Sequence, residues 1–274
     1  MPGAILEGLA LHSGGRSRVR LHREAGPLRF RRGRVTIPAR LSQVASTERA
    51  TTLSAEGASV ALVEHLLAAC RLAGFWSGLL IEVEGEELPI LDGSAQPWLE
   101  VLRDLGPAPN APAPLRLGAP LERRAGESLL RLSPGPDALA VEIRFAHAAI
   151  GVQRWSGAPE RYAELADART FGFLHELTAL RAVGLATQAT LENAIVFGDE
   201  GPLAPLRHSD EPVRHKALDF LGDSVLLTQP LSGRLEIVRG SHASHIAFLD
   251  HIRRHALRRH GLEHGLEPGA TDVG

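Results

Sequence analysis

The chain lacks several features that mark whole classes of protein. Among its 274 residues there is one cysteine, Cys70, which excludes an internal disulfide. No apolar run approaches the roughly 20 residues of a membrane-spanning helix. Residues 1–15 also lack the basic start and the apolar block of a secretory signal. We therefore expect a cytoplasmic protein without a membrane span.

The sequence offers little for binding nucleic acid. Its formal net charge is −2, no long basic run interrupts the first 250 residues, and one tyrosine and three tryptophans are available to stack on bases. These counts argue against a nucleic-acid partner. With 44% hydrophobic and 23% charged residues, the composition is that of an ordinary folded globular protein.

A proline-rich stretch at 106–114 divides the chain. Its prolines neither continue a helix nor donate to a sheet, so we predict an extended linker there. On this basis residues 1–105 form a first domain and residues 115–262 a second, both of ordinary domain size. We expect residues 263–274, which are rich in Gly, Glu and Pro, to be a frayed tail.

Strands and helices are mixed along the chain, which predicts α/β mixing within each domain. β-rich or alternating runs predict strands at 19–21, 35–37, 79–83, 129–132, 138–145 and 235–238. Apolar patterns predict helices at 63–72, 174–183, 211–221 and 242–259, the first of them ending at Gly74.

The helix predicted at 211–221 carries the most specific pattern in the chain. Among the 30 lysine and arginine residues only Lys216 is a lysine, which suggests a position where a compact ammonium fits and a guanidinium does not. Beside it, His215 and Asp219 are four residues apart and share one helix face, as two metal ligands would, and Asp223 continues that face. The alternative is a solvated polar face.

Three other places hold candidate functional groups. Glu64 and His65 open an apolar helix, where each needs a partner, although an exposed helix start would also suit Glu64. His242 follows a predicted strand and begins the last helix. Thr170 and Phe171, beside Gly172, suit polar and stacking contact with a sugar, or else a sheet edge with core aromatics.

Several segments together carry a family resemblance. They are Leu11-His12-Ser13-Gly14, Val63-Glu64-His65-Leu66, Pro89-Ile90-Leu91-Asp92-Gly93-Ser94-Ala95, Arg169-Thr170-Phe171-Gly172-Phe173, Val213-Arg214-His215-Lys216-Ala217-Leu218-Asp219, Gly222-Asp223 and His242. In this order they resemble the UDP-3-O-acyl-N-acetylglucosamine deacetylase family of lipid A biosynthesis, and they span nearly the whole chain.

The resemblance implies an α+β fold of two similar domains, each a β-sheet layer packed with α-helices, with the active site at the domain interface. It implies a catalytic zinc held by His65, His215 and Asp219, a ligand set that ferrous iron also suits. The expected substrate is a UDP-sugar with an acyl chain, whose N-acetyl group is hydrolysed to acetate and a free amine. We expect a monomer.

The family also implies a role for each remaining candidate. Glu64 would be the general base, His242, held by Asp223, the general acid, and Thr170 a donor to the oxyanion. Lys216 would supply positive charge to the substrate or intermediate, and Phe171 a packing surface for it. Residues 167–197 match the family's insertion, which forms a passage for the acyl chain.

The sequence departs from the family pattern near the substrate region. The departures are Ser241 in place of Gly, His245 in place of Asn, 187–190 in place of a Gly-Gly-Ser stretch, Leu62 in place of Thr, and 76–78 near the usual Asp-Asn. They leave two alternatives, a deacetylase of another N-acetylated sugar and a non-catalytic binding protein. A structural zinc normally has four protein ligands, so a set of three favours catalysis.

Overall fold

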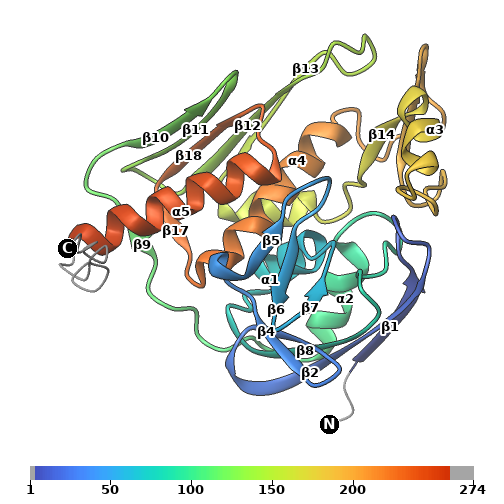
Figure 1. Ribbon diagram of the computed structural model, residues 1–274. Helices are drawn as coiled ribbons and strands as arrows, with labels where there is room; N and C mark the ends of the chain where they lie inside the picture. The colour runs from blue at the N-terminus through green and yellow to red at the C-terminus, as the bar shows by residue number, and fades with distance from the viewer. Residues whose placement is uncertain (1–3, 260–274) are drawn as a thin grey trace, which may run out of the picture.

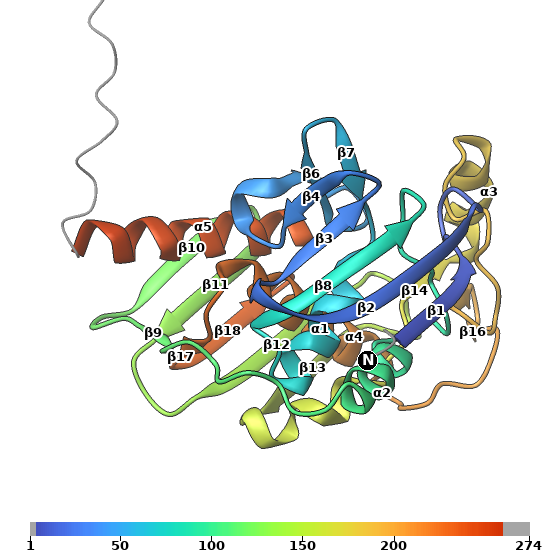
Figure 2. The same ribbon diagram turned by 90° about the horizontal axis from the view of Figure 1, so that it is seen from below.

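The computed structural model of the chain describes residues 4–259 (Figures 1 and 2), so the tail predicted at 263–274 lies outside the described residues. Two five-stranded sheets account for most of its strands. The first sheet has the order β1-β2-β8-β3-β4, with β1 at Ala4–Leu9, β2 at Arg16–Pro27, β3 at Arg29–Arg32, β4 at Val35–Pro38 and β8 at Ser77–Glu84. The second has the order β10-β11-β18-β12-β13, with β10 at Leu121–Ala125, β11 at Ser128–Ser133, β12 at Ala138–Arg144, β13 at Val152–Gly157 and β18 at Arg234–Val238.

The two sheets have the same topology. In each, the last strand along the chain lies between the second and the third, pairing antiparallel with the second and parallel with the third. A helix precedes that last strand and another follows it. These are α1 (Glu64–Ala73) and α2 (Gln96–Asp104) in the first half, and α4 (Glu211–Ser224) and α5 (His242–Arg259) in the second. The expected α+β fold with two similar halves is therefore confirmed.

Each half carries its own insertion before the first of its two helices. In the first half this is a small sheet of β5 (Val44–Ser46), β6 (Thr52–Ala55) and β7 (Ala58–Val60). In the second half it is β14 (Phe171–Phe173), α3 (Leu174–Ala182), β15 (Ile195–Gly198) and β16 (Gly201–Pro202), which Figure 1 shows to one side of both large sheets. The remaining elements are two short strands, β9 (Leu115–Arg116) and β17 (Leu231–Ser232), and 3-10 turns at Leu41–Gln43, Pro159–Leu165 and Val225–Leu227.

Local sequence explains the elements that hold the site. In β2, Val19 and Leu21 are buried, while Arg18 and Arg20, which alternate with them, face outward and pair with Glu84 of β8. Helix α1 ends as predicted at Gly74, whose φ of 82° is left-handed, and the next backbone N–H, of Phe75, donates to the carbonyl of Cys70 at 2.8 Å. The segment 106–114 forms neither helix nor strand, and the domain boundaries drawn from it stay a prediction.

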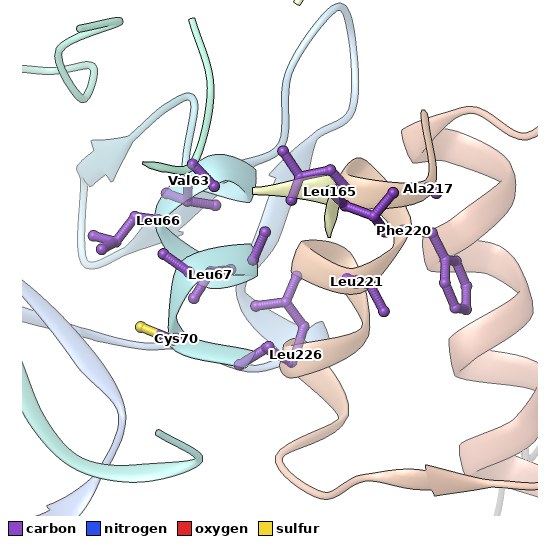
Figure 3. Packing of buried hydrophobic residues seen from close by; sticks show 14 of the residues in the cluster. Val63, Leu66, Leu67, Cys70, Leu165, Ala217, Phe220, Leu221 and Leu226 are labelled. Atoms are coloured by element: carbon purple, nitrogen blue, oxygen red, sulfur yellow. The ribbon is translucent and has the colours of Figure 1, made fainter. Parts of the chain in front are cut away.

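The two halves meet along α1 and α4, which lie side by side between the large sheets (Figure 1). Figure 3 shows apolar side chains of both helices, with Leu66 and Leu67 from α1 and Phe220 and Leu221 from α4; Leu66 points away from α4, and Phe220 points toward α5. All four are at most 3% exposed. Gly222 brings the backbones close, because a Cβ there would lie 2.1 Å from the carbonyl oxygen of Glu64. The helices that carry the candidate site residues are therefore in direct contact.

Candidate active site

The close packing of α1 and α4 brings together the three residues expected to bind metal. His65 stands in the first turn of α1, and His215 and Asp219 follow one another on a face of α4. All three are buried, and each offers a ligand atom within 4.8 Å of the others. The rings of His65 and His215 meet edge to face, with centroids 5.0 Å apart.

The polar atoms of this group are arranged as a cation would require. Nδ1 of His215 donates to the carbonyl oxygen of Ala168 at 3.0 Å, which leaves Nε2 as the acceptor of a neutral ring. That Nε2 lies 3.3 Å from Oδ1 of Asp219, an atom buried without a hydrogen-bond partner in the part of the chain that the structure describes. Two acceptors facing each other in a buried place fit a positive ion between them.

The charge states of the group suit the same conclusion. Burial lowers the pKa of His65 to about 3, helped by the positive charge of its neighbours, and burial also lowers the pKa of His215. Burial opposes ionisation of Asp219, but His215 and Lys216 outweigh it and hold its pKa well below the usual value. At neutral pH the site therefore presents two neutral imidazoles and one carboxylate, the donor set that zinc and ferrous iron accept.

Lys216, the single lysine, touches this group directly. Its Nζ donates to Oδ2 of Asp219 at 2.7 Å and lies 5.7 Å from the centre of the Phe171 ring. Burial would lower the pKa of Lys216, but Asp219 outweighs it and raises that pKa, so the ammonium stays charged. Lys216, Phe171 and Asp219 are therefore neighbours.

Glu64 lies one residue before His65 and is 2% exposed, which rules out the alternative of an exposed helix start. Its Oε2 accepts from the backbone N–H of Thr51 at 3.0 Å, and its Oε1 is 3.8 Å from Nε2 of His242. Burial raises the pKa of Glu64 to about 7, against the opposing effect of His242. A carboxylate with this pKa can take and return a proton near neutral pH.

His242 faces Glu64 and is paired behind with Asp223. Its Nδ1 donates to Oδ2 of Asp223 at 2.8 Å, and the same oxygen accepts from Nδ1 of His245 at 2.8 Å. Burial would lower the pKa of His242, but Asp223 and Glu64 together raise it to about 10. The ring is therefore an imidazolium whose Nε2–H points toward Glu64 and the metal group.

Asp223, His242 and His245 also lie close enough to hold a metal ion. In this second group, however, the Asp223 carboxylate already accepts a hydrogen bond from each ring. The Nδ1 atoms are thus occupied as donors, whereas in the first group an oxygen is left without a partner. The group of His65, His215 and Asp219 is the better metal site.

A largely apolar cavity of about 130 Å³ lies beside these groups. Thr170 and Phe171 line it together with residues of the second insertion and of the segment Leu11–His12. The ring of Phe171 also contacts His215, with centroids 6.4 Å apart, which places the cavity wall next to the metal group. Residues 171–173 form strand β14 at the edge of a three-stranded sheet, as the second interpretation of this motif expected, and contact with a sugar stays a prediction.

Two residues that shape the site have no functional signal of their own in the sequence. Thr51 binds Glu64 and Asp223 from a loop of the first insertion, and no motif marks it. Arg169 belongs to a family motif that gives it no role of its own. In the structure it is buried and donates through its backbone N–H and its Nε to Glu211 at the start of α4, at 3.0 and 2.9 Å. This buried pair fixes the strand that carries Phe171 against α4.

A buried group of two histidines and one aspartate, beside a carboxylate of raised pKa and an imidazolium, is typical of metal-dependent hydrolases. Over residues 3–254 the chain matches the LpxC family, described as UDP-3-O-acyl N-acetylglycosamine deacetylase. The chain belongs to this family, which confirms the resemblance that its motifs indicate. Within residues 4–259, no helix has the length and apolar character needed to cross a membrane.

Individual relatives agree with the family match. The chain is similar to a protein of Thermosynechococcus vestitus named UDP-3-O-acyl-N-acetylglucosamine deacetylase, with 43% identity over 87% of each chain. Proteins of the same name from Nitratidesulfovibrio vulgaris and Oleidesulfovibrio alaskensis are 39% and 40% identical. These two matches cover 91% and 97% of this chain and 85% and 95% of the relatives.

Proposed function

We propose that the protein hydrolyses the N-acetyl group of UDP-3-O-acyl-N-acetylglucosamine in lipid A biosynthesis, releasing acetate and the free amine. Zinc, or ferrous iron in the cell, would be held by His65, His215 and Asp219. The observation that carries the proposal is the partnerless, buried Oδ1 of Asp219 facing the acceptor Nε2 of His215, in a chain that belongs to the LpxC family. The reaction adds water across the amide C–N bond, which breaks.

A metal bound there would act as a Lewis acid that polarises the acetyl carbonyl and favours ionisation of the attacking water. Glu64 takes the proton of that water, for which its pKa of about 7 is suited. As charge develops on the carbonyl oxygen, the Thr170 hydroxyl donates to it and Lys216 lends its positive charge. Phe171 packs against the substrate at the cavity wall.

The amine leaves once it has been protonated. His242 is the donor, because its Nδ1–H is committed to Asp223 and its Nε2–H is free to face the substrate. Its pKa of about 10 keeps it charged until the leaving nitrogen becomes basic. Glu64 thus acts as the base and His242 as the acid, and the 3.8 Å between Oε1 of Glu64 and Nε2 of His242 brings both groups within reach of one reacting bond.

The cavity supports a substrate with an acyl chain. Leu177, Leu180 and Val196 of the second insertion face it, and apolar walls bind a hydrocarbon chain by removing its surface from water. Arg49 and Glu176 stand at the same cavity, 4.0 Å apart, and give it a polar edge. We propose that this cavity is the passage for the acyl chain, as expected for residues 167–197.

The test is acetate release from UDP-3-O-acyl-N-acetylglucosamine carrying acyl chains of several lengths, with and without a metal chelator. We expect release by the metal-loaded protein, loss with chelator, and recovery when zinc is added. Glu64→Gln should keep one equivalent of metal and lose about 10²- to 10⁴-fold in rate. The exposed Glu160→Gln is the matched control and should equal the wild type.

The outcomes separate this proposal from its alternatives. Metal-dependent release from a different N-acetylated sugar, with no release from the UDP-sugar, would keep the chemistry and replace the substrate. Full metal content with no hydrolysis of either would favour a binding protein. Undiminished turnover by Glu64→Gln would remove Glu64 from the role of base.

A further inference from the structure

Thr51 is a buried residue that hydrogen-bonds to both Glu64 and Asp223. It lies in the loop just before β6, in the insertion of the first half, and its side chain is fully buried. Its backbone N–H donates to Oε2 of Glu64 at 3.0 Å, and its hydroxyl donates to Oδ1 of Asp223 at 2.7 Å. One residue thus binds both the general base and the carboxylate that holds the general acid.

The bond to Asp223 determines how that carboxylate is oriented. Oδ2 of Asp223 accepts from Nδ1 of His242 and from Nδ1 of His245, while Oδ1 accepts from a single side chain among residues 4–259, that of Thr51. The two donors on Oδ2 hold one oxygen of the carboxylate. A donor on the other oxygen fixes its plane, and with it the direction of the His242 ring.

The same hydroxyl oxygen lies 3.3 Å from Nδ1 of His242, so the ring is also in contact with Thr51. Nδ1–H of His242 is donated to Asp223, so the Thr51 hydroxyl does not take this proton. The hydroxyl instead limits the movement of the His242 ring by its contact. Asp223 and His242 come from the second half of the chain, and Thr51 from the first. The acid is therefore aligned by a residue from the half of the chain that carries the base.

We propose that Thr51 is a positioning residue that orients the His242 ring relative to Glu64. Proton acceptance by Glu64 and proton donation by His242 then occur at one reacting bond. This inference rests on the proposed function. Thr51 does not touch the metal group or the substrate cavity in the contacts of the described residues, so its removal should affect the chemical step and leave binding intact.

A pair of reciprocal substitutions tests the inference. Thr51→Val keeps the shape and removes the hydroxyl, whereas Thr51→Ser keeps the hydroxyl and removes the methyl group. With the zinc-loaded full chain and the acyl UDP-sugar, Thr51→Val should lower kcat about 10- to 100-fold with KM unchanged within about twofold. Thr51→Ser should stay within about threefold of the wild type in both constants.

Two further measurements guard against a purely structural explanation. Metal content should stay at one equivalent in both variants, and the Nδ1 proton of His242 in NMR spectra should shift in Thr51→Val but not in Thr51→Ser. If Thr51→Val does not fold, Thr51→Cys takes its place, because its S–H is a weak donor of similar size, and its kcat should fall between wild type and a tenfold loss.

The kinetic results for the two variants decide whether Thr51 is a positioning residue. Wild-type kcat in Thr51→Val would overturn the inference, and so would an equal loss in Thr51→Ser, which would assign the effect to packing. A loss expressed in KM alone would make Thr51 a binding residue. If the wild type itself releases no acetate, the proposed function fails, while the His242 proton shift still reports whether Thr51 aligns the ring.

Discussion

Gly222 is the position where a single methyl group should disturb the fold and the site together. In Gly222→Ala the new Cβ would lie 2.1 Å from the carbonyl oxygen of Glu64 and 2.9 Å from its carbonyl carbon. Both atoms are backbone, so no side chain can swing away. Since real Cβ contacts do not fall below 3.0 Å, α4 and α1 must separate by about 1 Å.

The magnitude follows from where the separation occurs. Overpacking a tight contact typically costs about 1–3 kcal/mol of unfolding free energy. Gly222 stands three residues after Asp219 on α4, and the atom it would strike belongs to Glu64 on α1. The same displacement therefore moves Asp219 and His215 away from His65, and a misplacement of about 1 Å can cost roughly 100-fold in rate.

The assays are urea unfolding, metal content and acetate release, measured on the same preparations. We expect Gly222→Ala to lose stability and activity and to bind metal more weakly. Gly15→Ala is the matched control, because Gly15 is exposed, has an ordinary φ, and its Cβ would meet nothing closer than 3.7 Å. Wild-type activity and stability in Gly222→Ala would refute the argument that this glycine sets the spacing of the ligands.

Three more predictions concern charge and shape. Lys216→Arg should keep its metal and its unfolding midpoint but lose more than about tenfold in kcat, because the forked guanidinium does not fit the place of a compact ammonium; normal kinetics would make the lone lysine incidental. Burial opposes ionisation of Glu211, but hydrogen bonds from Arg169 outweigh it and lower its pKa, so this pair stabilises the fold above the usual carboxyl pKa and ceases to do so as the pH falls through the lowered value. Urea unfolding of Glu211→Gln should therefore show lower stability at about pH 7 and a smaller change between about pH 7 and pH 3 than the wild type, and an unchanged pH response would count against the ion pair. Leu180→Trp should slow release from long-chain substrates more than from short-chain ones, whereas Leu174→Trp, on an exposed part of α3, should not discriminate between them.

The sequence predicted the elements whose patterns are local. Helix α5 begins and ends at the predicted residues, 242 and 259. Helix α4 begins at 211 as predicted and runs three residues longer than expected, and α1 stops at Gly74 as predicted. The sequence did not predict helix α2 or the strands β1, β3, β5, β6, β7, β9, β10, β13, β15, β16 and β17. Helix α2 begins Gln96-Pro97-Trp98 and spans nine residues, too short for its apolar pattern to stand out beside the preceding turn.

The family resemblance implies two similar domains, but the residue pattern itself does not show the shared topology of the two sheets. No internal sequence repeat is visible, and each half places its insertion in a different form before the equivalent helix. The equivalence lies in strand order and pairing, which depend on long-range contacts. What the chain did reveal was the pair of His215 and Asp219, because two ligands four residues apart on one helix need no tertiary information.

The parts of the site that sequence could not reveal come from distant segments. Thr51 reaches Asp223 across 172 residues and is an ordinary threonine in an ordinary loop. His245 was visible as a departure from the family pattern, and the structure shows that it serves as a second donor to Asp223. Its Nε2 is buried without a hydrogen-bond partner among the described residues, a cost that its Nδ1 bond offsets only in part.

The central claim is that one metal ion binds between the two halves, at His65, His215 and Asp219. The most direct measurement is an anomalous difference map, collected at the zinc edge, from crystals of the zinc-loaded protein. The account predicts one peak about 2.0–2.2 Å from a nitrogen of each histidine and an oxygen of the aspartate. A map with no peak there, or with its peak among Asp223, His242 and His245, would contradict it.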